Sequence, residues 1–145
     1  MKIEKLLESH LRECSNIYVE TFNSEPWNDN WDSTTSHNRL KDIYLTPGFY
    51  GLVALEETKI IAAVLGNIEH WYEGNMYNLK EMFVNQSLKR NGIGSILMEA
   101  LEKSLKANDV NSITLLTSKG DLTEKFYNKN GYSTFSDMIM MHKNI

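Results

Sequence analysis

A link that combines glycine with positive charge is the segment of the chain best suited to hold an anion. Gly92-Ile93-Gly94-Ser95 separates a strand-like run from a helix-like run, and Lys89 and Arg90 precede it. Glycine lets the backbone approach a ligand closely, and the first turn of a helix offers free N–H groups and a positive dipole end. The segment therefore predicts a pyrophosphate site, with a tight strand-to-helix turn as the alternative.

Two other phosphate-binding patterns do not occur in the sequence. The P-loop needs G-x-x-x-x-G-K-[ST], which is found nowhere in the chain. The dinucleotide fingerprint needs a third glycine, but Leu97 holds that position, and four strand-like runs precede the link. Neither class of nucleotide site is therefore predicted.

Hydrophobic periodicity divides the chain into strands and helices that must position this link. Two runs have the apolar spacing of amphipathic helices, and three strand-like runs joined by short turns indicate an antiparallel meander. The expected strands are 1–6, 49–55, 59–72, 76–84, 112–117 and 132–142; the expected helices are 11–22, one capped by Asp32 or Ser33 that ends before Pro47, 93–107 and 122–128. The order β-α-α-β-β-β-α-β-α-β is an α/β (α+β) fold. The helix between 76–84 and 112–117 makes these two strands parallel.

Length and composition favour a single soluble domain over residues 1–145. The chain is 41% hydrophobic with a formal net charge of −4, whereas nucleic-acid binding calls for a basic stripe. Cys14 is the only cysteine, so no intrachain disulfide can form, and its apolar helix face predicts a buried structural thiol rather than a nucleophile. The charged N-terminus and the short apolar runs predict neither a signal peptide nor a membrane span. A cytoplasmic location is expected, and no metal site is assigned.

The last expected strand carries an unusually apolar run, Met138-Ile139-Met140-Met141. Near the edge of a sheet, such a run can pair with a second copy of the chain. A core strand explains it equally well, so a homodimer is one of two interpretations.

The segment from Val84 to Gly94, VNQSLKRNGIG, resembles the acetyl-CoA motif [QR]-x-x-G-x-[GA] of the GNAT N-acetyltransferases. Lys89 stands where that family usually has Gln or Arg, and the Asn that often follows its fifth strand is replaced by Thr117-Ser118-Lys119. The resemblance covers nearly the whole chain. It implies a sheet whose two central parallel strands splay apart, with acetyl-CoA as cosubstrate. It assigns the pyrophosphate to Lys89, Arg90, Asn91, Gly92, Ile93, Gly94 and Ser95, and the pantetheine arm to backbone groups of Phe83 and Val84.

A second segment, EKFYNKNGY, is similar to the F-Y-x-x-x-G-[FY] pattern of the same family. The resemblance places Tyr127 near the sulfur of coenzyme A. When an amine attacks a thioester, a thiolate leaves, and a phenol can donate a proton to it. The resemblance implies that Tyr127 is this general acid, and packing against the cofactor is the alternative.

Glu81 is the candidate general base or substrate anchor. Alternate residues of a strand share a face, so Glu81 and Phe83 are expected to point the same way. Glu69 and His70 on the preceding strand are alternative bases, and water is another. A structural carboxylate bonded to its surroundings is the other interpretation of Glu81.

The acceptor side is expected in the loop Glu25-Pro26-Trp27-Asn28-Asp29-Asn30-Trp31-Asp32. The carboxylates of Glu25 and Asp29 and the rings of Trp27 and Trp31 suit a cationic amine through ion pairs and cation–π contacts. The tryptophans can equally pin the loop to the core.

The pattern PWNxxW is similar to a subgroup of aminoglycoside 6′-N-acetyltransferase-like proteins. The resemblance implies transfer of an acetyl group from acetyl-CoA to a primary amine, by direct attack in a ternary complex. An aminoglycoside, a small amine or polyamine, and a protein N-terminus or lysine all remain open as acceptors. A non-catalytic acyl-CoA sensor is the alternative to an enzyme.

Overall fold

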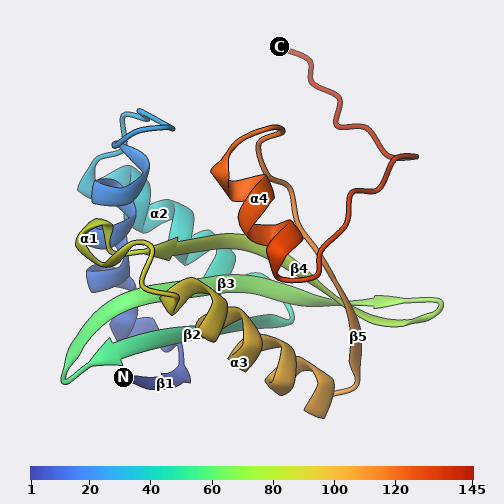
Figure 1. Ribbon diagram of the computed structural model, residues 1–145, viewed down its shortest axis with the longest axis horizontal. Helices are drawn as coiled ribbons and strands as arrows, with labels where there is room; N and C mark the ends of the chain where they lie inside the picture. The colour runs from blue at the N-terminus through green and yellow to red at the C-terminus, as the bar shows by residue number, and fades with distance from the viewer.

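The computed structural model describes residues 1–145 and contains one five-stranded sheet with helices on both faces (Figure 1). The strands are β1 (Lys2–Lys5), β2 (Phe49–Glu56), β3 (Lys59–Trp71), β4 (Gly74–Val84) and β5 (Val110–Thr114). The α-helices are α1 (Leu11–Phe22), α2 (Ser33–Tyr44), α3 (Ile93–Ala107) and α4 (Leu122–Lys129), and two short 3₁₀ helices are η1 (Glu8–His10) and η2 (Gln86–Leu88). None of the helices is long and apolar enough to cross a membrane.

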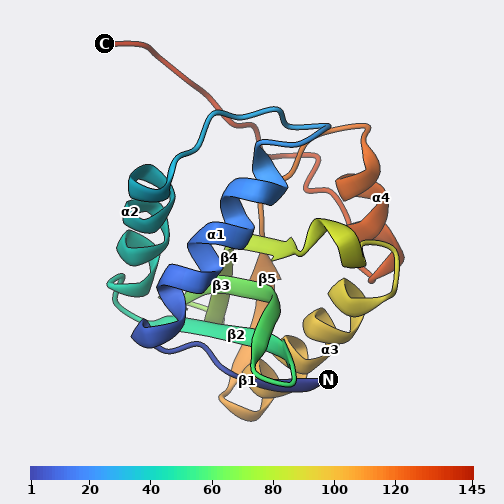
Figure 2. The same ribbon diagram turned by 90° about the vertical axis from the view of Figure 1, so that its left-hand side faces the viewer.

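The sheet has the strand order β1-β2-β3-β4-β5. The first four strands form an antiparallel meander, and β5 pairs with β4 in parallel. The meander and the parallel pair predicted from turn lengths and the helical crossover are therefore confirmed. Helices α1 and α2 lie on one face of the sheet, and α3 and α4 lie on the other (Figure 2).

Each face of the sheet has its own apolar core. The core under α1 and α2 includes Leu11, Cys14 and Tyr18, whose spacing places them on one side of α1. Cys14 is fully buried, and this burial raises the pKa of its thiol to about 12, as expected of a structural cysteine. The core on the other face is formed around Leu97, Met98, Leu101 and Leu105 of α3.

Local capping explains where the helices begin and end. Asp32 caps α2 and accepts a hydrogen bond from the backbone N–H of Thr35 at 2.7 Å. Asp121 caps α4 in the same way. Gly131 lies just beyond the end of α4 with a φ of +90°, the left-handed conformation in which glycine commonly ends a helix.

Strands β4 and β5 separate after a short paired region. Their register runs from Asn75 opposite Val110 to Asn78 opposite Thr114, and no pairing follows. The second half of β4 therefore has an open edge toward β5, which is the splay that the resemblance implied. The opening lies beside α4 and the N-terminal end of α3 (Figure 1).

A bulge at Lys80 changes which face the later residues of β4 present. Opposite β3, Leu65 pairs with Glu81 and Gly66 pairs with Leu79, so Lys80 is the extra residue. Leu79 packs in the core below α3, whereas Phe83 packs in the core below α1 and α2. Strict alternation from Leu79 would have turned Glu81 toward α3; the bulge turns it toward α1 and α2 instead.

The expected strand over residues 132–142 is wrong. This segment has no strand, and no backbone hydrogen bond involves any residue after Tyr132. The run Met138-Ile139-Met140-Met141 is apolar, but a strand exists only where a neighbouring strand accepts and donates its hydrogen bonds. The segment instead leaves the domain, so β5 is the last strand of the sheet (Figure 1).

Candidate active site

The link between β4 and α3 presents a row of backbone N–H groups that no protein acceptor satisfies. Asn85 caps η2, and the chain then passes through Arg90 and Gly92, whose φ angles are +68° and +76°. None of the N–H groups from Arg90 to Ser95 donates to another backbone group. A run of such donors at the start of a helix, with a positive dipole end behind it, is a suitable site for an anion.

The two glycines of this link have different physical roles. A Cβ added to Gly92 would meet no atom within 4 Å, so glycine is needed there only for its positive φ. Gly94 lies inside the first turn of α3, and a Cβ there would stand 3.0 Å from Cε of Met82 and 3.2 Å from the ring of Phe126. Gly94 therefore lets α3 lie close to both β4 and α4.

Lys89 joins the link to the loop between α1 and α2. Its Nζ lies 4.9 Å from the centroid of the Trp27 ring, within range of a cation–π contact. Partial burial lowers the pKa of Lys89. Arg90 and Asn91 are exposed. The sequence analysis assigns Lys89 to the pyrophosphate and Trp27 to the acceptor side, and the structure brings these two side chains into contact.

Tyr127 of α4 points across the opening between β4 and β5. Its hydroxyl donates to Sδ of Met82 on β4 at 3.8 Å. The rings of Phe126 and Tyr132 flank it, with centroids 5.1 and 5.6 Å away. Burial raises the pKa of Tyr127 to about 12, and the negative charge of Glu81 acts in the same direction. The phenol therefore keeps its proton at neutral pH.

Glu81 is held by two side chains from α1 and α2, the helices that cover its own face of the sheet. Its Oε1 accepts hydrogen bonds from Tyr18 Oη at 3.1 Å and from Arg39 Nε at 3.0 Å, and it forms an ion pair with Arg39 in which Nη2 lies 3.0 Å away. No hydrogen bond reaches Oε2. Burial raises the pKa of Glu81, while Arg39 and Tyr18 oppose that shift and the charge of Asp29 adds a small part to it.

Glu81 and Phe83 point the same way, as strand alternation predicted. Both contact Tyr18: the Phe83 ring meets it edge-on, with centroids 5.5 Å apart.

The backbone N–H and C=O groups of successive residues along β4 also alternate in direction, between β3 and the open edge. The N–H of Asn85 donates to Ile61 of β3, so the N–H of Val84 points to the open edge and the backbone groups of Phe83 face β3.

The two alternative bases lie elsewhere on the sheet. Glu69 is fixed by the amides of Asn67 and Asn78, which donate to its Oε1 at 3.2 and 3.4 Å. His70 contacts Asn75 at 2.9 Å near the turn between β3 and β4. Glu81 pairs with Leu65, five residues before His70, which corresponds to about 16 Å along the strand. His70 and Glu81 therefore do not share a site.

The tryptophans of the α1–α2 loop pack against α1. Trp27 meets Phe22 with centroids 5.0 Å apart, and Trp31 meets Tyr18 at 5.0 Å. The indole N–H of Trp31 donates to Asp29 Oδ2 at 3.0 Å. The tryptophans therefore pin the loop to α1, which is one of the two roles expected for them. Trp31 contacts Tyr18, and Tyr18 donates to Glu81, so this packing brings Trp31 and Asp29 toward Glu81. Glu25 is exposed and forms no ion pair.

Tyr18 and Arg39 are parts of this site that sequence reasoning missed. Tyr18 lies on the apolar face of α1, where its spacing marked it only as a core residue. Arg39 precedes the fully buried Leu40 on α2 and is a charged residue on an otherwise ordinary amphipathic helix. The signal that could have pointed to Arg39 is Glu81 itself, because a buried carboxylate needs a cationic partner.

The family of the chain follows from a match that spans most of this architecture. The model of the Acetyltransferase (GNAT) family matches residues 9–132, from η1, just before α1, to the residue that follows Gly131 beyond α4. The chain belongs to the GNAT family. It is therefore an acetyl-CoA-dependent N-acetyltransferase, as its acetyl-CoA motif indicated. A comparison with curated proteins gives no match.

Solved structures share the GNAT fold at low sequence identity. An aminoglycoside acetyltransferase from an uncultured soil metagenomic sample, in complex with sisomicin, is 20% identical with a TM-score of 0.77, covering 99% of this chain and 95% of that one. A possible acetyltransferase from Clostridium difficile 630 is 16% identical with a TM-score of 0.81, covering 99% and 97%. AAC(6′)-Iy, in complex with a bisubstrate analogue of coenzyme A and acetylneamine, is 16% identical with a TM-score of 0.74, covering 99% and 98%.

Proposed function

We propose that this GNAT protein acetylates a primary amine of a small cationic molecule by direct attack in a ternary complex. One observation carries the proposal. After the bulge, the neighbouring residues Glu81 and Met82 face opposite sides of β4, so that a held carboxylate lies on one side and the Tyr127 hydroxyl on the other. Both are at the edge of β4 from which β5 has separated. A base and an acid are therefore available on the two sides of one opening.

The free N–H groups from Arg90 to Ser95 fit the pyrophosphate of acetyl-CoA. Lys89 supplies positive charge beside them, and the outward N–H of Val84 is available to the pantetheine arm. The backbone of Phe83 faces β3, so its contribution is the packing of its ring under α1. When bound, acetyl-CoA supplies the acetyl group as an activated thioester.

Tyr127 holds the proton that the leaving sulfur needs. The new bond joins the acceptor nitrogen to the acetyl carbon, while the carbon–sulfur bond breaks and its electron pair passes to sulfur. A phenol with a pKa of about 12 is fully protonated at neutral pH and can donate to that sulfur. The hydroxyl already donates to a sulfur atom, Sδ of Met82, at the open edge.

Glu81 takes the proton that the acceptor ammonium must lose, directly or through water. Arg39 and Tyr18 occupy Oε1 and fix the carboxylate, which leaves Oε2 for the acceptor. Burial raises the pKa of Glu81, so its basicity is greater than that of an exposed glutamate. Asp29 adds negative charge to the same side and supports the binding of a cation.

The charge of the acceptor side favours a small polycationic amine. Asp29, Glu81 and Glu69 lie on the side of the sheet that α1 and α2 cover, and the aromatic ring of Trp31 lies beside Asp29. The fold is shared with aminoglycoside acetyltransferases, so aminoglycosides are the first acceptors to examine, followed by polyamines. A cytoplasmic location stays a prediction.

Release of the coenzyme A thiol from acetyl-CoA tests the proposal. The protein is incubated with aminoglycosides, polyamines, amino acids and short peptides, and the free thiol is measured together with the acetylated product. We expect turnover with a small polycationic amine. Turnover confined to peptides would contradict the proposed acceptor, and binding of acetyl-CoA without turnover of any amine would favour an acyl-CoA sensor.

A further inference from the structure

Thr21, in the last turn of α1, donates its hydroxyl proton to a residue that lies 63 positions further along the chain. Its Oγ1 is 3.3 Å from the carbonyl oxygen of Val84, the last residue of β4. Hydroxyls inside a helix usually bond to a carbonyl of the preceding turn, as Ser15 of the same helix does with Arg12 at 2.8 Å. Thr21 is only 2% exposed. Its hydrogen bond is therefore shielded from water and joins α1 to the end of β4.

The carbonyl of Val84 needs a donor from outside the sheet. The N–H of Asn85 donates to β3, so the N–H and the C=O of Val84 both point to the edge from which β5 has separated. β4 and β5 pair only as far as Asn78 and Thr114. Thr21 therefore takes the place that a neighbouring strand would have as the donor to this carbonyl. It leaves the N–H of Val84 free.

A second hydrogen bond returns from the link between β4 and α3 to the same residue of α1. Nε2 of Gln86 donates to the carbonyl oxygen of Thr21 at 3.0 Å, in the last turn of the helix, where carbonyls lack a helical partner. Asn85 stands between the two bonds. Its N–H donates to Ile61 of β3 at 2.8 Å, and its side chain accepts from the N–H of Ser87 at 3.0 Å. Thr21 thus holds the residues on both sides of the point where β4 ends and the link begins.

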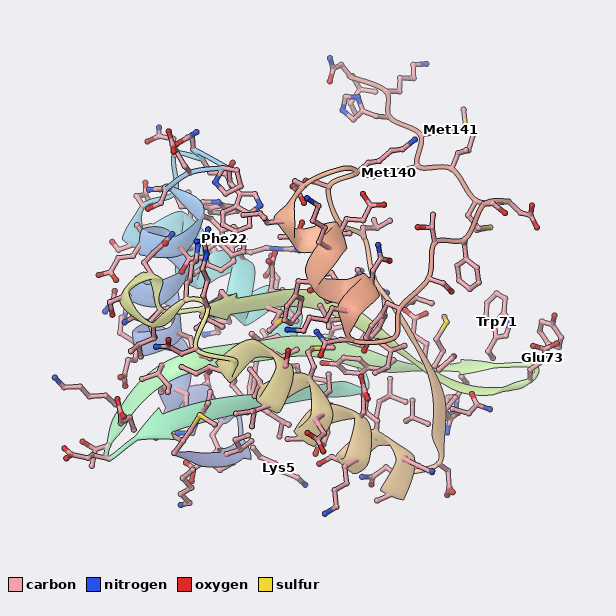
Figure 3. The ribbon with its side chains drawn as sticks, in the orientation of Figure 1. Lys5, Phe22, Trp71, Glu73, Met140 and Met141 are labelled. Atoms are coloured by element: carbon pink, nitrogen blue, oxygen red, sulfur yellow. The ribbon has the colours of Figure 1, made fainter.

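Phe22, the last residue of α1, extends this contact to the acceptor side. Its ring lies beside the end of β4, with its centroid 6.4 Å from that of Phe83 (Figure 3). Its carbonyl accepts from the N–H of Asp29 at 2.9 Å, and its ring contacts Trp27. The loop on the acceptor side therefore starts from the same end of α1 that Thr21 fixes to β4.

We propose that Thr21 and Gln86 form a clamp that positions the backbone of β4 and of the link for acetyl-CoA. The clamp fixes the peptide of Val84, so that its free N–H keeps pointing out of the open edge, where the pantetheine arm is proposed to bind. It also fixes the start of the link whose N–H groups, from Arg90 to Ser95, are proposed to hold the pyrophosphate. Both side chains are positioning residues that act through the backbone. The inference rests on the proposed place of acetyl-CoA at this edge, and not on the identity of the acceptor.

Calorimetric titration with acetyl-CoA tests the clamp in the full chain, without turnover. Thr21→Val keeps the shape of the side chain and removes the hydroxyl, and it is expected to raise the Kd roughly three- to ten-fold, the effect of one lost hydrogen bond. Thr21→Ser keeps the hydroxyl and is expected to restore most of the affinity. Gln86→Met removes the other donor at a half-buried side chain. It is expected to weaken binding as well, and less than additively with Thr21→Val.

Tyr77→Phe is the matched control. The Tyr77 hydroxyl also donates to a backbone carbonyl, that of Tyr50 at 2.8 Å, but near the other end of β4 and in the core below α3. Its loss is expected to lower the melting temperature, as Thr21→Val does, and to leave the Kd of acetyl-CoA unchanged. A Thr21→Val variant that loses thermal stability but keeps its Kd would show that the clamp is only a structural tie. That result overturns the proposal, and so does a Thr21→Ser variant that binds as weakly as Thr21→Val.

Gly92→Ala separates a failure of the clamp from a failure of the proposed cofactor site. If Gly92→Ala raises the Kd of acetyl-CoA and Thr21→Val does not, the link binds the cofactor and only the clamp is wrong. If neither variant changes the Kd, acetyl-CoA does not bind at the link, and the proposed site and the clamp are both wrong.

Discussion

Nζ of Lys89 lies 4.9 Å from the centroid of the Trp27 ring, and this contact joins the two loops at the mouth of the site. Lys89 belongs to the link before α3 that is proposed to hold the pyrophosphate, and Trp27 belongs to the loop on the acceptor side. Trp27 is itself fixed by Phe22 of α1. The position of one binding loop therefore depends on the other.

Replacing Trp27 by Leu is expected to weaken the binding of acetyl-CoA as well as of the acceptor. Loss of the ring removes a cation–π contact of about 0.5–1 kcal/mol, which is roughly a two- to five-fold rise in the Kd of acetyl-CoA. Calorimetric titration with acetyl-CoA measures it. In a double-mutant cycle with Lys89→Met, the two effects are expected to be less than additive.

Trp71→Leu is the control for that cycle, because Trp71 is exposed at the end of β3 and far from Lys89. It is expected to leave the Kd unchanged. Full additivity of Trp27→Leu and Lys89→Met would contradict a direct contact between the two side chains.

Gly92→Ala is expected to impair acetyl-CoA binding through the backbone alone. The new methyl group meets no neighbour, but a φ of +76° costs an alanine roughly 1–2 kcal/mol, so the N–H groups of the link turn away from their present directions. We expect a clear rise in the Kd of acetyl-CoA with a small loss of thermal stability. Gly131→Ala is the matched control: Gly131 has a φ of +90° and equally open surroundings, so its replacement should lower stability without changing the Kd. Equal Kd values for the two variants would contradict the role of the link.

Local sequence patterns predicted most of the elements that build the site. The helix over residues 93–107 begins and ends as expected, because its apolar spacing is regular and Gly92 precedes its first turn. The parallel pairing of β4 and β5 followed from the crossover helix. Tyr127 and the link between β4 and α3 were predicted from two motifs, and each motif lies within one continuous segment of the chain.

Contacts between distant segments could not be predicted in this way. The partners of Glu81 are 63 and 42 residues away, and nothing in the spacing of α1 or α2 distinguishes Tyr18 or Arg39 from a core residue and a surface charge. The bulge at Lys80 leaves no composition signal. The expected strand over residues 132–142 is wrong for the same reason, because the sequence of a segment does not show whether a neighbouring strand is available to pair with it.

Tyr127→Phe is expected to lower kcat about 100-fold, the smaller end of the range for a general acid. Phenylalanine preserves the ring contacts with Phe126 and Tyr132, so the Kd of acetyl-CoA should change little. Because the pKa of Tyr127 is about 12, its ionisation should cause no loss of rate between pH 7 and pH 10 in the unmodified enzyme. Tyr132→Phe is the control, since its hydroxyl donates to Glu102 and not into the opening. A Tyr127→Phe variant with full turnover would show that the ring only packs.

Arg39→Met is expected to shift the acidic limb of the pH–rate profile to higher pH. Burial already raises the pKa of Glu81 above its ordinary 4.5, and the guanidinium of Arg39 lowers it, so removal of that charge raises the pKa further. Glu81 accepts a proton only as the carboxylate. The rate therefore falls as the pH drops through the pKa of Glu81, and this fall begins at a higher pH in the variant.

Lys41→Met separates this effect from a general loss of positive charge on α2. Lys41 lies two residues further along the helix, and its only ion pair is a 3.9 Å contact with the exposed Glu8. Its replacement is expected to leave the profile of kcat/KM against pH in place. Glu81→Gln completes the set, because an amide cannot take up the proton and the acidic limb should disappear together with most of the rate. If Arg39→Met moved the limb to lower pH, or Glu81→Gln retained it, a group other than Glu81 would be the base.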